Sequence, residues 1–396
     1  MKDCEMTAAE IMAEDKKYIM RTYGRLPVVL TEGKGCRVKD IDGKEYLDLV
    51  AGIAVNGLGH CPEVVVKAIK EQAETLMHTS NLYYTLPQIK LAKLLVEISG
   101  MTKAFFCNSG AEANEAAMKL ARKATKVAGH PEKTVIITAE KSFHGRTLAA
   151  ITATGQPKYQ KMFTPLPPDY KYVPFNDVEA LKAAVDEKTC AVMLEPVQGE
   201  SGVHPGTAEY FKTARELCDK FGCALIFDEV QTGLGRTGKL FGFENFGVKP
   251  NIMSLAKTLA GGFPMGAMLA AGKYAEVFEP GDHASTFGGN PLAAAAAFAT
   301  VSEIARPGFM DEVTEKGDYF RAELAKIEGV KEARGLGFMI GIELEKPDAR
   351  AYAEEFLNKG FIVNPIGDSI IRLVPPLILS KAEIDEFVGA AKNIIK

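Results

Sequence analysis

Short apolar runs alternate with longer amphipathic segments through the middle of the chain. Segments with a helical period of apolar positions cover residues 111–125 and 206–221. The apolar runs that predict strands cover 104–107, 134–138, 190–194, 224–227, 252–255 and 266–270. This alternation of strand and helix predicts an α/β fold with a mostly parallel sheet that helices cover on both faces.

The pattern changes after Pro291. We expect an alanine-rich helix over 292–304, then strands and helices in mixed order. The expected strands cover 338–344, 361–363 and 370–374, and the expected helices cover 349–359 and 381–395. Ser380 and Glu383 have the spacing of a capping box at the last of these helices. The predicted division is 1–58 as a segment that joins a small α+β domain, 59–291 as a large domain, and 292–396 as the rest of the small domain.

Charge and hydropathy exclude two classes of partner. The chain has 47 basic and 51 acidic residues, a net charge of -4, so it has no basic field to attract a nucleic acid. Its longest apolar stretches, such as 291–299, are too short to span a bilayer. Residues 1–18 mix acidic and basic side chains without an apolar core, so we expect no secretory signal there.

Cysteine and histidine usage indicates the compartment and bears on metal binding. The seven cysteines are scattered and form no CxxC pair, the closest two being Cys218 and Cys223. This spacing predicts free thiols in a reducing cytoplasm. The six histidines include no HExxH pair, so no metal site is expected.

Reactive side chains follow three of the expected strands. Glu195 and Asp228 come directly after two of them, and Lys257 comes shortly after a third. Ligands of open α/β sheets bind beyond the carboxyl ends of the strands. A single acid at a strand end is usually a helix cap or a surface ion pair, but three such groups at one edge predict a site.

A glycine-containing turn between a strand and a helix predicts an anion cradle beside these groups. Residues 108–112 read Asn-Ser-Gly-Ala-Glu, and a helix that begins there directs backbone N–H groups and its dipole toward an anion. Alone, this pattern also fits an ordinary capped helix. A second segment, 233–238, matches GxGxxG but opens no convincing helix and has no acid in the required context, so nucleotide binding is not expected.

These segments together resemble one enzyme family over nearly the whole chain. The matching stretches include YLDLVAGIAVNGLGH (46–60), FCNSGAEANE (106–115), FHGRT (143–147), EPVQGE (195–200), DEVQT (228–232), STFGGN (285–290) and IRLVPP (371–376). The chain is similar to the class III aminotransferases of the aspartate-aminotransferase fold type. The resemblance implies a seven-stranded type of large sheet, pyridoxal 5′-phosphate as cofactor, and an obligate homodimer with shared sites.

The resemblance assigns cofactor roles by residue. It implies that Lys257 carries the cofactor as a Schiff base and later moves the substrate proton. Asp228 would keep the pyridine nitrogen protonated, which makes the ring an electron sink, and Gln231 would bond the ring's phenolic oxygen. The other implied cofactor contacts are Ser109, Gly110, Ala111, Phe143, Glu229, Val230 and, from the neighbouring subunit, Thr286.

Substrate roles follow in the same way. Arg146 resembles the residue that clamps a substrate carboxylate, Ser285 is a further contact, and Arg372 resembles the arginine that takes the α-carboxylate of glutamate. Glu200 resembles the acid that pairs with this arginine. Ile53 stands where ornithine-specific members have a tyrosine, and an apolar side chain cannot replace that hydroxyl.

The expected reaction is ω-amino transfer from N-acetylornithine to 2-oxoglutarate, a step of arginine biosynthesis that gives N-acetylglutamate 5-semialdehyde and glutamate. Succinyldiaminopimelate, ornithine and 4-aminobutyrate remain alternative donors on the same site. A glutamate-semialdehyde aminomutase and a non-catalytic cofactor-binding protein are the alternatives of a different class. Dependence on 2-oxoglutarate distinguishes a transaminase from a mutase.

Overall fold

The computed structural model describes residues 6–395 and contains one large sheet of seven strands in the order β4-β12-β11-β10-β7-β5-β6. The strands are β4 (Lys103–Cys107), β5 (Val135–Ala139), β6 (Tyr170–Val173), β7 (Thr189–Leu194), β10 (Ala224–Asp228), β11 (Ile252–Leu255) and β12 (Gly266–Ala270). Strand β12 is antiparallel to both neighbours, and the other six run in one direction. The prediction of a mostly parallel sheet is confirmed.

Strand β6 was not predicted from the sequence. It pairs with one neighbour only, β5, and three of its four residues are partly or fully accessible to solvent, so it has no continuous apolar run. The interior strands β5, β7, β10, β11 and β12 are buried at every position. A run of apolar residues is what the sequence shows when a strand is covered on both faces.

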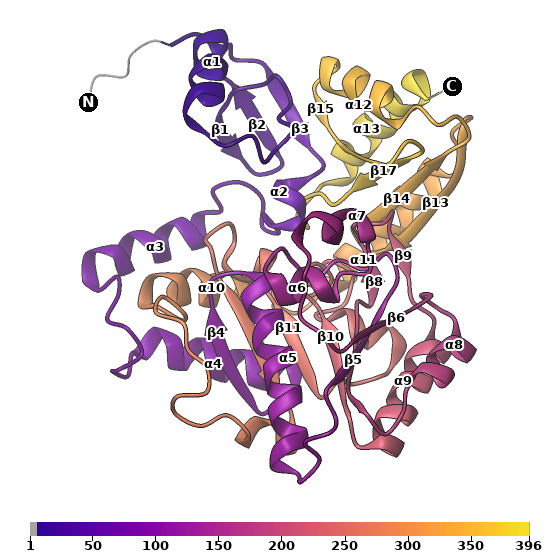
Figure 1. Cartoon of the computed structure of the whole chain (residues 1–396). Helices are drawn as coiled ribbons and strands as arrows, with labels where there is room; N and C mark the ends of the chain where they lie inside the picture. Colours follow the sequence, from indigo (N-terminus) through magenta and orange to yellow (C-terminus); the bar gives the residue numbers. More distant parts are fainter. Residues whose placement is uncertain (1–5, 396) are drawn as a thin grey trace.

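Two apolar cores lie on opposite faces of this sheet. One contains Ile136 and Ile226 together with the buried face of α5 (Gly110–Val127). The other contains their neighbours Ile137 and Leu225 together with α9 (Ala208–Phe221) and α10 (Pro291–Ile304). Because successive strand residues point to opposite faces, adjacent positions belong to different cores. Figure 1 shows α5 crossing in front of the sheet.

The two ends of the chain lie side by side. Strands β1 (Leu30–Lys34), β2 (Arg37–Asp40) and β3 (Glu45–Asp48) form a sheet with β15 (Phe361–Ile362), which pairs parallel to β3. Beside it lies a sheet of β13 (Val330–Leu336), β14 (Met339–Leu344), β17 (Ile370–Leu373) and β16 (Asn364–Ile366). Figure 1 shows β1–β3 beside α12 (Ala349–Asn358), α13 (Lys381–Ile394) and β15. The predicted capping box of Ser380 and Glu383 is confirmed at α13.

Helices complete the described chain. Helix α10 packs against α3 (Glu63–Thr75) and α4 (Leu86–Ser99), so residues 291–304 contact the large sheet's layer of helices. The remaining helices are α1 (Ala8–Tyr18), α2 (Ala51–Ala54), α6 (Leu148–Ala153), α7 (Pro157–Gln160), α8 (Val178–Ala184) and α11 (Phe309–Leu324). A two-stranded sheet pairs β8 (Val197–Gln198) with β9 (His204–Pro205). Within residues 6–395, none of the helices has both the length and the apolar character needed to cross a membrane.

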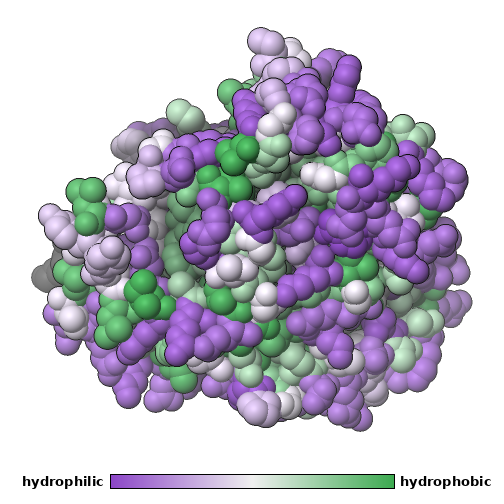
Figure 2. Space-filling model, turned by 90° about the horizontal axis from the view of Figure 1, so that it is seen from below, coloured by the Kyte–Doolittle hydropathy of each residue, from purple (hydrophilic) through white to green (hydrophobic). Residues whose placement is uncertain are grey.

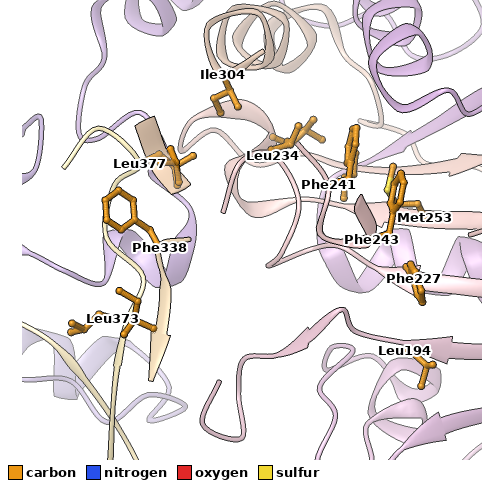
Figure 3. Packing of buried hydrophobic residues seen from close by; sticks show 14 of the residues in the cluster. Leu194, Phe227, Leu234, Phe241, Phe243, Met253, Ile304, Phe338, Leu373 and Leu377 are labelled. Carbon is orange, nitrogen blue, oxygen red and sulfur yellow. The ribbon is translucent and has the colours of Figure 1, made fainter. Parts of the chain in front are cut away.

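One continuous core joins the large sheet to the C-terminal strands. Figure 3 shows Leu194 and Phe227 of the sheet, Phe241 of the following loop, and Phe338 and Leu373 of the C-terminal part within it. The backbones also approach closely. A Cβ atom on Gly337 would lie 2.5 Å from the backbone nitrogen of Gly238, and Gly337 has a φ of +51°.

We expect Gly337→Ala to destabilise the protein well beyond the effect of a left-handed alanine alone. Its methyl group would collide with backbone atoms that cannot move aside. Gly247→Ala is the matched control, because Gly247 also has a left-handed φ (+66°) but nothing within 4 Å of its Cβ position. The control should lose about 1 kcal/mol of stability. Urea unfolding of both variants measures the difference, and equal midpoints would contradict the close approach.

Candidate active site

A cavity of about 470 Å³ opens beyond the carboxyl ends of β7, β10 and β11. Glu195, Asp228 and Lys257 all line it, and so do Phe143 and Arg146 from the segment after β5. The sheet topology therefore brings together the groups that the sequence placed at strand ends. Among residues 6–395, no three histidine, cysteine or acidic side chains are arranged to hold a metal ion.

The Asp228 carboxylate makes hydrogen bonds to two side chains and one backbone N–H in the cavity wall. Its Oδ2 accepts hydrogen bonds from Asn114 Nδ2 at 2.7 Å and bonds His144 Nδ1 at 2.8 Å. Its Oδ1 accepts from the N–H of Val230 at 3.0 Å. Asp228 is only 4 % exposed, so these bonds replace the water that a charged carboxylate would otherwise need.

Lys257 lines the same cavity and follows β11, the strand next to β10. It begins a short 3₁₀ helix (Lys257–Ala260) and has a left-handed φ of +39°, uncommon for a residue with a side chain. Burial lowers the pKa of its amine to about 8, although the charges of Glu200 and Asp228 oppose this. A substantial fraction of the amine is therefore neutral near physiological pH, which is the nucleophilic form.

Arg372 enters the site from the C-terminal sheet and pairs with Glu200. Its NH1 lies 2.6 Å from Glu200 Oε1 and 3.3 Å from Gln231 Oε1. Asn364 Oδ1 accepts from both Nε and NH2, at 3.1 and 2.6 Å. Burial by itself would raise the pKa of Glu200, but Arg372 and Lys257 outweigh it and lower the pKa to about 2. The pair is ionised and almost closed to solvent on the arginine side, where Arg372 is 1 % exposed.

The N-terminus of α5 forms the cradle that the sequence predicted. Ser109 caps the helix by accepting from the N–H of Glu112, and Ser109, Gly110 and Ala111 all line the cavity. The first-turn N–H groups of a helix have no intrahelical partner and can bind an anion. A Cβ on Gly110 would lie 2.7 Å from Val230 Cγ1, so only glycine leaves this wall undisturbed. These residues fit a phosphate group, and Asp228 across the cavity fits a protonated ring nitrogen.

Aromatic and cationic side chains line the cavity beside this cradle. Phe143 is partly buried, and its N–H donates to Glu195 Oε2 at 3.1 Å. The Arg146 guanidinium lies over the Tyr159 ring at 4.0 Å and is exposed. It is free of ion pairs within residues 6–395, and it remains available to a carboxylate that enters the cavity.

Four residues of the predicted site do not line this cavity, and one of them, Arg372, reaches it only through Glu200 and Gln231. The Glu229 carboxylate turns inward and accepts from Thr232 Oγ1 (2.5 Å) and from the N–H groups of Gly242 and Phe243 (2.8 Å each), so the structure gives it a loop-closing position in place of the expected cofactor contact. Ser285 and Thr286 line a separate surface hollow with Asn81 and Gln88. Ser285 Oγ reaches the cavity wall indirectly, by accepting from Asn108 Nδ2 at 3.0 Å.

A left-handed turn just before Val55, which lines the cavity, was not foreseen. Residues 51–54 have φ values between +51° and +65°, including Ile53 at +63°, a strained conformation for a β-branched side chain. Asp48 accepts from the N–H groups of Val50 and Ala51, and Thr258 donates to the Ala54 carbonyl at 3.0 Å. The turn therefore abuts the Lys257 helix.

Sequence reasoning also missed Asn114, His144 and Asn364, which hold Asp228 and Arg372. His144 and Asn114 stood inside recognised motifs, at FHGRT and in the helix after the cradle, but nothing local showed where their side chains point. Asn364 follows an expected strand without any motif. The pairing of β16 with β17 sets Asn364 opposite Arg372, where its side chain can accept hydrogen bonds from the guanidinium.

Comparison with known proteins agrees with this geometry. Residues 18–395 match the family described as Aminotransferase class-III. The acetylornithine aminotransferase of Methanocaldococcus jannaschii is 55% identical over 385 residues, 96% of each chain, and that of Caldanaerobacter subterraneus subsp. tengcongensis is 54% identical over 96% of this chain and 98% of its own.

Solved structures show the same likeness. The ornithine aminotransferase from Toxoplasma gondii superposes with a TM-score of 0.94 at 32% identity, covering 98% of this chain and 95% of its own. The N-acetylornithine aminotransferase from Stenotrophomonas maltophilia gives a TM-score of 0.83 at 38% identity over 97% of this chain and 98% of its own. The chain belongs to the class-III aminotransferases and is a pyridoxal-phosphate-dependent enzyme.

Proposed function

We propose that this enzyme transfers the ω-amino group of N-acetyl-L-ornithine to 2-oxoglutarate, forming N-acetyl-L-glutamate 5-semialdehyde and L-glutamate in arginine biosynthesis. The observation that carries this proposal is the Glu200–Arg372 ion pair beside Lys257, in a chain 55% identical to an acetylornithine aminotransferase. A guanidinium that can be paired or uncovered suits a site that must accept two unlike amines in turn.

Three parts of the cavity wall would bind the cofactor. The α5 N-terminus with Ser109, Gly110 and Ala111 would hold the phosphate, and Lys257 would hold the aldehyde carbon. Asp228, fixed by Asn114 and His144, would hold a proton on the ring nitrogen. When bound, the cofactor supplies an electron sink for the electron pair that remains when the substrate carbon loses its proton. Lys257 is the base that takes this proton and returns it, because its amine has a pKa of about 8.

The remaining wall residues would orient the ring. Gln231 is expected to bond the phenolic oxygen while Val230 and Phe143 contact the ring faces, since all three line the cavity. Gln231 also donates to Glu200 Oε1 at 3.2 Å, which connects the ring's position to the substrate pair.

The two substrates differ in what they place near Arg372. Glutamate carries an α-carboxylate beside its reacting amine and would pair with Arg372, whereas N-acetylornithine has methylenes there. An unpaired buried guanidinium costs about 1–3 kcal/mol or more, so Glu200 would cover Arg372 while the ω-amine reacts. The carboxylate of N-acetylornithine would instead bind Arg146, whose guanidinium is exposed at the cavity. Ile53, 43 % exposed, offers ornithine's second amine no acceptor.

Assembly and location are part of the same proposal. Several large apolar side chains are exposed on the single chain: Met20 (83 %), Leu82 (83 %), Tyr84 (98 %), Leu86 (65 %) and Phe287 (59 %). Figure 2 shows small hydrophobic groups between hydrophilic ones on one face. Leu82 lines the hollow of Thr286, and Phe287 follows Thr286 in the chain. A homodimer that covers them would carry Thr286 toward the partner's phosphate cradle. The six described cysteines are free, which is typical of the cytoplasm.

Lys257→Ala tests the attachment site. The variant should fold but lose the visible absorbance of covalently held cofactor and nearly all turnover, because Lys257 is the one lysine among residues 6–395 that lines the cavity. Lys273→Ala, at an exposed lysine, is the control and should resemble the wild type. Turnover that survived in Lys257→Ala would refute the assignment.

The substrate proposal is tested by timing the two half-reactions separately in single-turnover absorbance experiments. The wild type should react with both N-acetylornithine and glutamate, and faster with N-acetylornithine than with ornithine. Glu200→Ala should speed the glutamate half-reaction and slow the N-acetylornithine one by about tenfold, the equivalent of one lost hydrogen bond to a charge.

Glu328→Ala, the same change at an exposed glutamate outside the cavity, serves as the control for general effects of substitution. Equal slowing of both half-reactions in Glu200→Ala would make the ion pair a fixed scaffold. A wild type that reacts with glutamate but with no N-acetylornithine would overturn the donor.

The dimer proposal is tested by mixing two impaired chains. A Lys257→Ala chain and a Thr286→Ala chain should together regain activity, because one of the two sites in each mixed dimer has both residues intact. Differently tagged chains allow the mixed dimers to be isolated before assay. If verified mixed dimers stayed as inactive as their parents, Thr286 would serve the site of its own chain.

A further inference from the structure

Two carboxyl groups stand side by side at the edge of the large sheet, and only one of them has a role so far. Strands β7 and β10 are parallel neighbours, with Leu194 opposite Phe227, so Glu195 and Asp228 occupy the next position of each strand. Both line the cavity, and they are 7 % and 4 % exposed. Two adjacent carboxylates shielded from water repel each other strongly, so they are not expected to be ionised together.

The bonds to the two groups decide which one is charged. Asp228 receives hydrogen bonds from the side chain of Asn114 and the N–H of Val230, and it also bonds His144. Glu195 Oε2 accepts one bond, from the N–H of Phe143 at 3.1 Å. Within residues 6–395, Glu195 Oε1 makes no hydrogen bond of its own. A negative charge is therefore much better stabilised on Asp228.

The charges around Glu195 point the same way. Burial and then the charge of Asp228 raise the pKa of Glu195 well above its usual value, with a smaller contribution from Glu200. Lys257 is the nearby cation that opposes them, and the one N–H bond from Phe143 also favours the ionised form. Lys257 stabilises a charged Glu195 only weakly, because burial lowers the pKa of the Lys257 amine to about 8 and part of the amine is neutral.

We propose that Glu195 is held as a neutral carboxylic acid in the active enzyme and serves as a positioning residue. Its Oε2 fixes the backbone of Phe143, and its protonated Oε1 is a hydrogen-bond donor toward the cavity. Of the two acids at these strand ends, Asp228 is then the one that presents a negative charge to the cofactor ring. The inference rests on the proposed cofactor site and deepens it.

The neutral state has a consequence for Lys257. An ionised Glu195 would raise the pKa of the Lys257 amine, as the charges of Glu200 and Asp228 already do. A neutral Glu195 adds no further negative charge, so more of the amine stays in the form that can accept a proton. A neutral Glu195 can thus accept the hydrogen bond from the Phe143 N–H without raising the pKa of Lys257.

The test uses the same chemical change on the two adjacent strands, Glu195→Gln and Asp228→Asn, in the holoenzyme. A glutamine reproduces a neutral acid, since its carbonyl can accept from Phe143 and its amide can donate toward the cavity. Glu195→Gln should retain most of the glutamate half-reaction rate, while Glu195→Ala should bind cofactor about tenfold more weakly because the Phe143 N–H loses its partner. Asp228→Asn should slow the reaction by orders of magnitude.

Infrared difference spectra report the protonation state independently of turnover. The wild-type minus Glu195→Gln spectrum at neutral pH should contain the carbonyl stretch of a protonated carboxylic acid and lack carboxylate bands. The wild-type minus Asp228→Asn spectrum should contain the carboxylate bands instead. Carboxylate bands assigned to Glu195, or a Glu195→Gln enzyme as slow as Asp228→Asn, would overturn the inference.

These readouts separate the inference from the proposed function. An enzyme that bound cofactor but failed to use N-acetylornithine would sink the function while leaving the infrared result decisive for Glu195. Should Glu195→Gln fail to fold, the wild-type minus Glu195→Ala spectrum reports the same group. The protonated band must then be present at neutral pH, and its absence would overturn the proposal.

Discussion

The parallel alignment of β7, β10 and β11 is the constraint on which the site depends. Because the three strands run in one direction, the residues that follow them emerge at one edge, where Glu195, Asp228 and Lys257 line a common cavity. The sheet is buried on both faces, so these strand ends are held rigidly by two apolar cores. A rigid support is what a site needs when the positions of several groups must agree closely.

Charge is distributed unevenly over this buried edge. Arg372 is a cation and the amine of Lys257 is partly neutral, whereas Asp228 and Glu200 are the acids that hydrogen bonds or an ion pair support. Each charged acid has donors or a cation beside it, whereas Glu195 has a single backbone N–H. The same physical rule accounts for all of them: a buried carboxylate keeps its charge only where hydrogen bonds or an ion pair replace water.

The C-terminal strands complete the site because they are fastened to the loop after β10. Arg236 is fully buried, and its NH1 donates to the carbonyls of Phe338 (3.1 Å) and Pro375. Pro375 follows Arg372 by three residues, and Gln231 precedes Arg236 by five. The close approach at Gly337 adds a second tie. Arg372 is thereby held against Glu200 and Gln231, which line the cavity.

Much of this protein can be predicted from local patterns. The interior strands appear as apolar runs because both of their faces are covered, and the expected strands at 252–255 and 266–270 match β11 and β12. Alternation of strands and helices was enough to predict the α/β class. The short, continuous motifs also singled out Lys257, Asp228 and Glu200, which line the cavity, and Arg372, which pairs with Glu200.

Tertiary structure decided what depends on contacts between distant segments. The direction of β12 and the existence of the edge strand β6 follow from pairing, which no local run of residues encodes. Glu229 shares a motif with Asp228, yet adjacent side chains at a strand end point to opposite sides, so one faces the cavity and the other the loop. Folding also brings Asn114 and His144 to Asp228, and Asn364 to Arg372, where they form hydrogen bonds that no local pattern predicts. The sequence alone determined which chemistry was available, and the fold determined which atoms meet, because hydrogen bonds act over a few ångströms while the residues that make them can be far apart in the chain, as Glu200 and Arg372 are, at 172 positions.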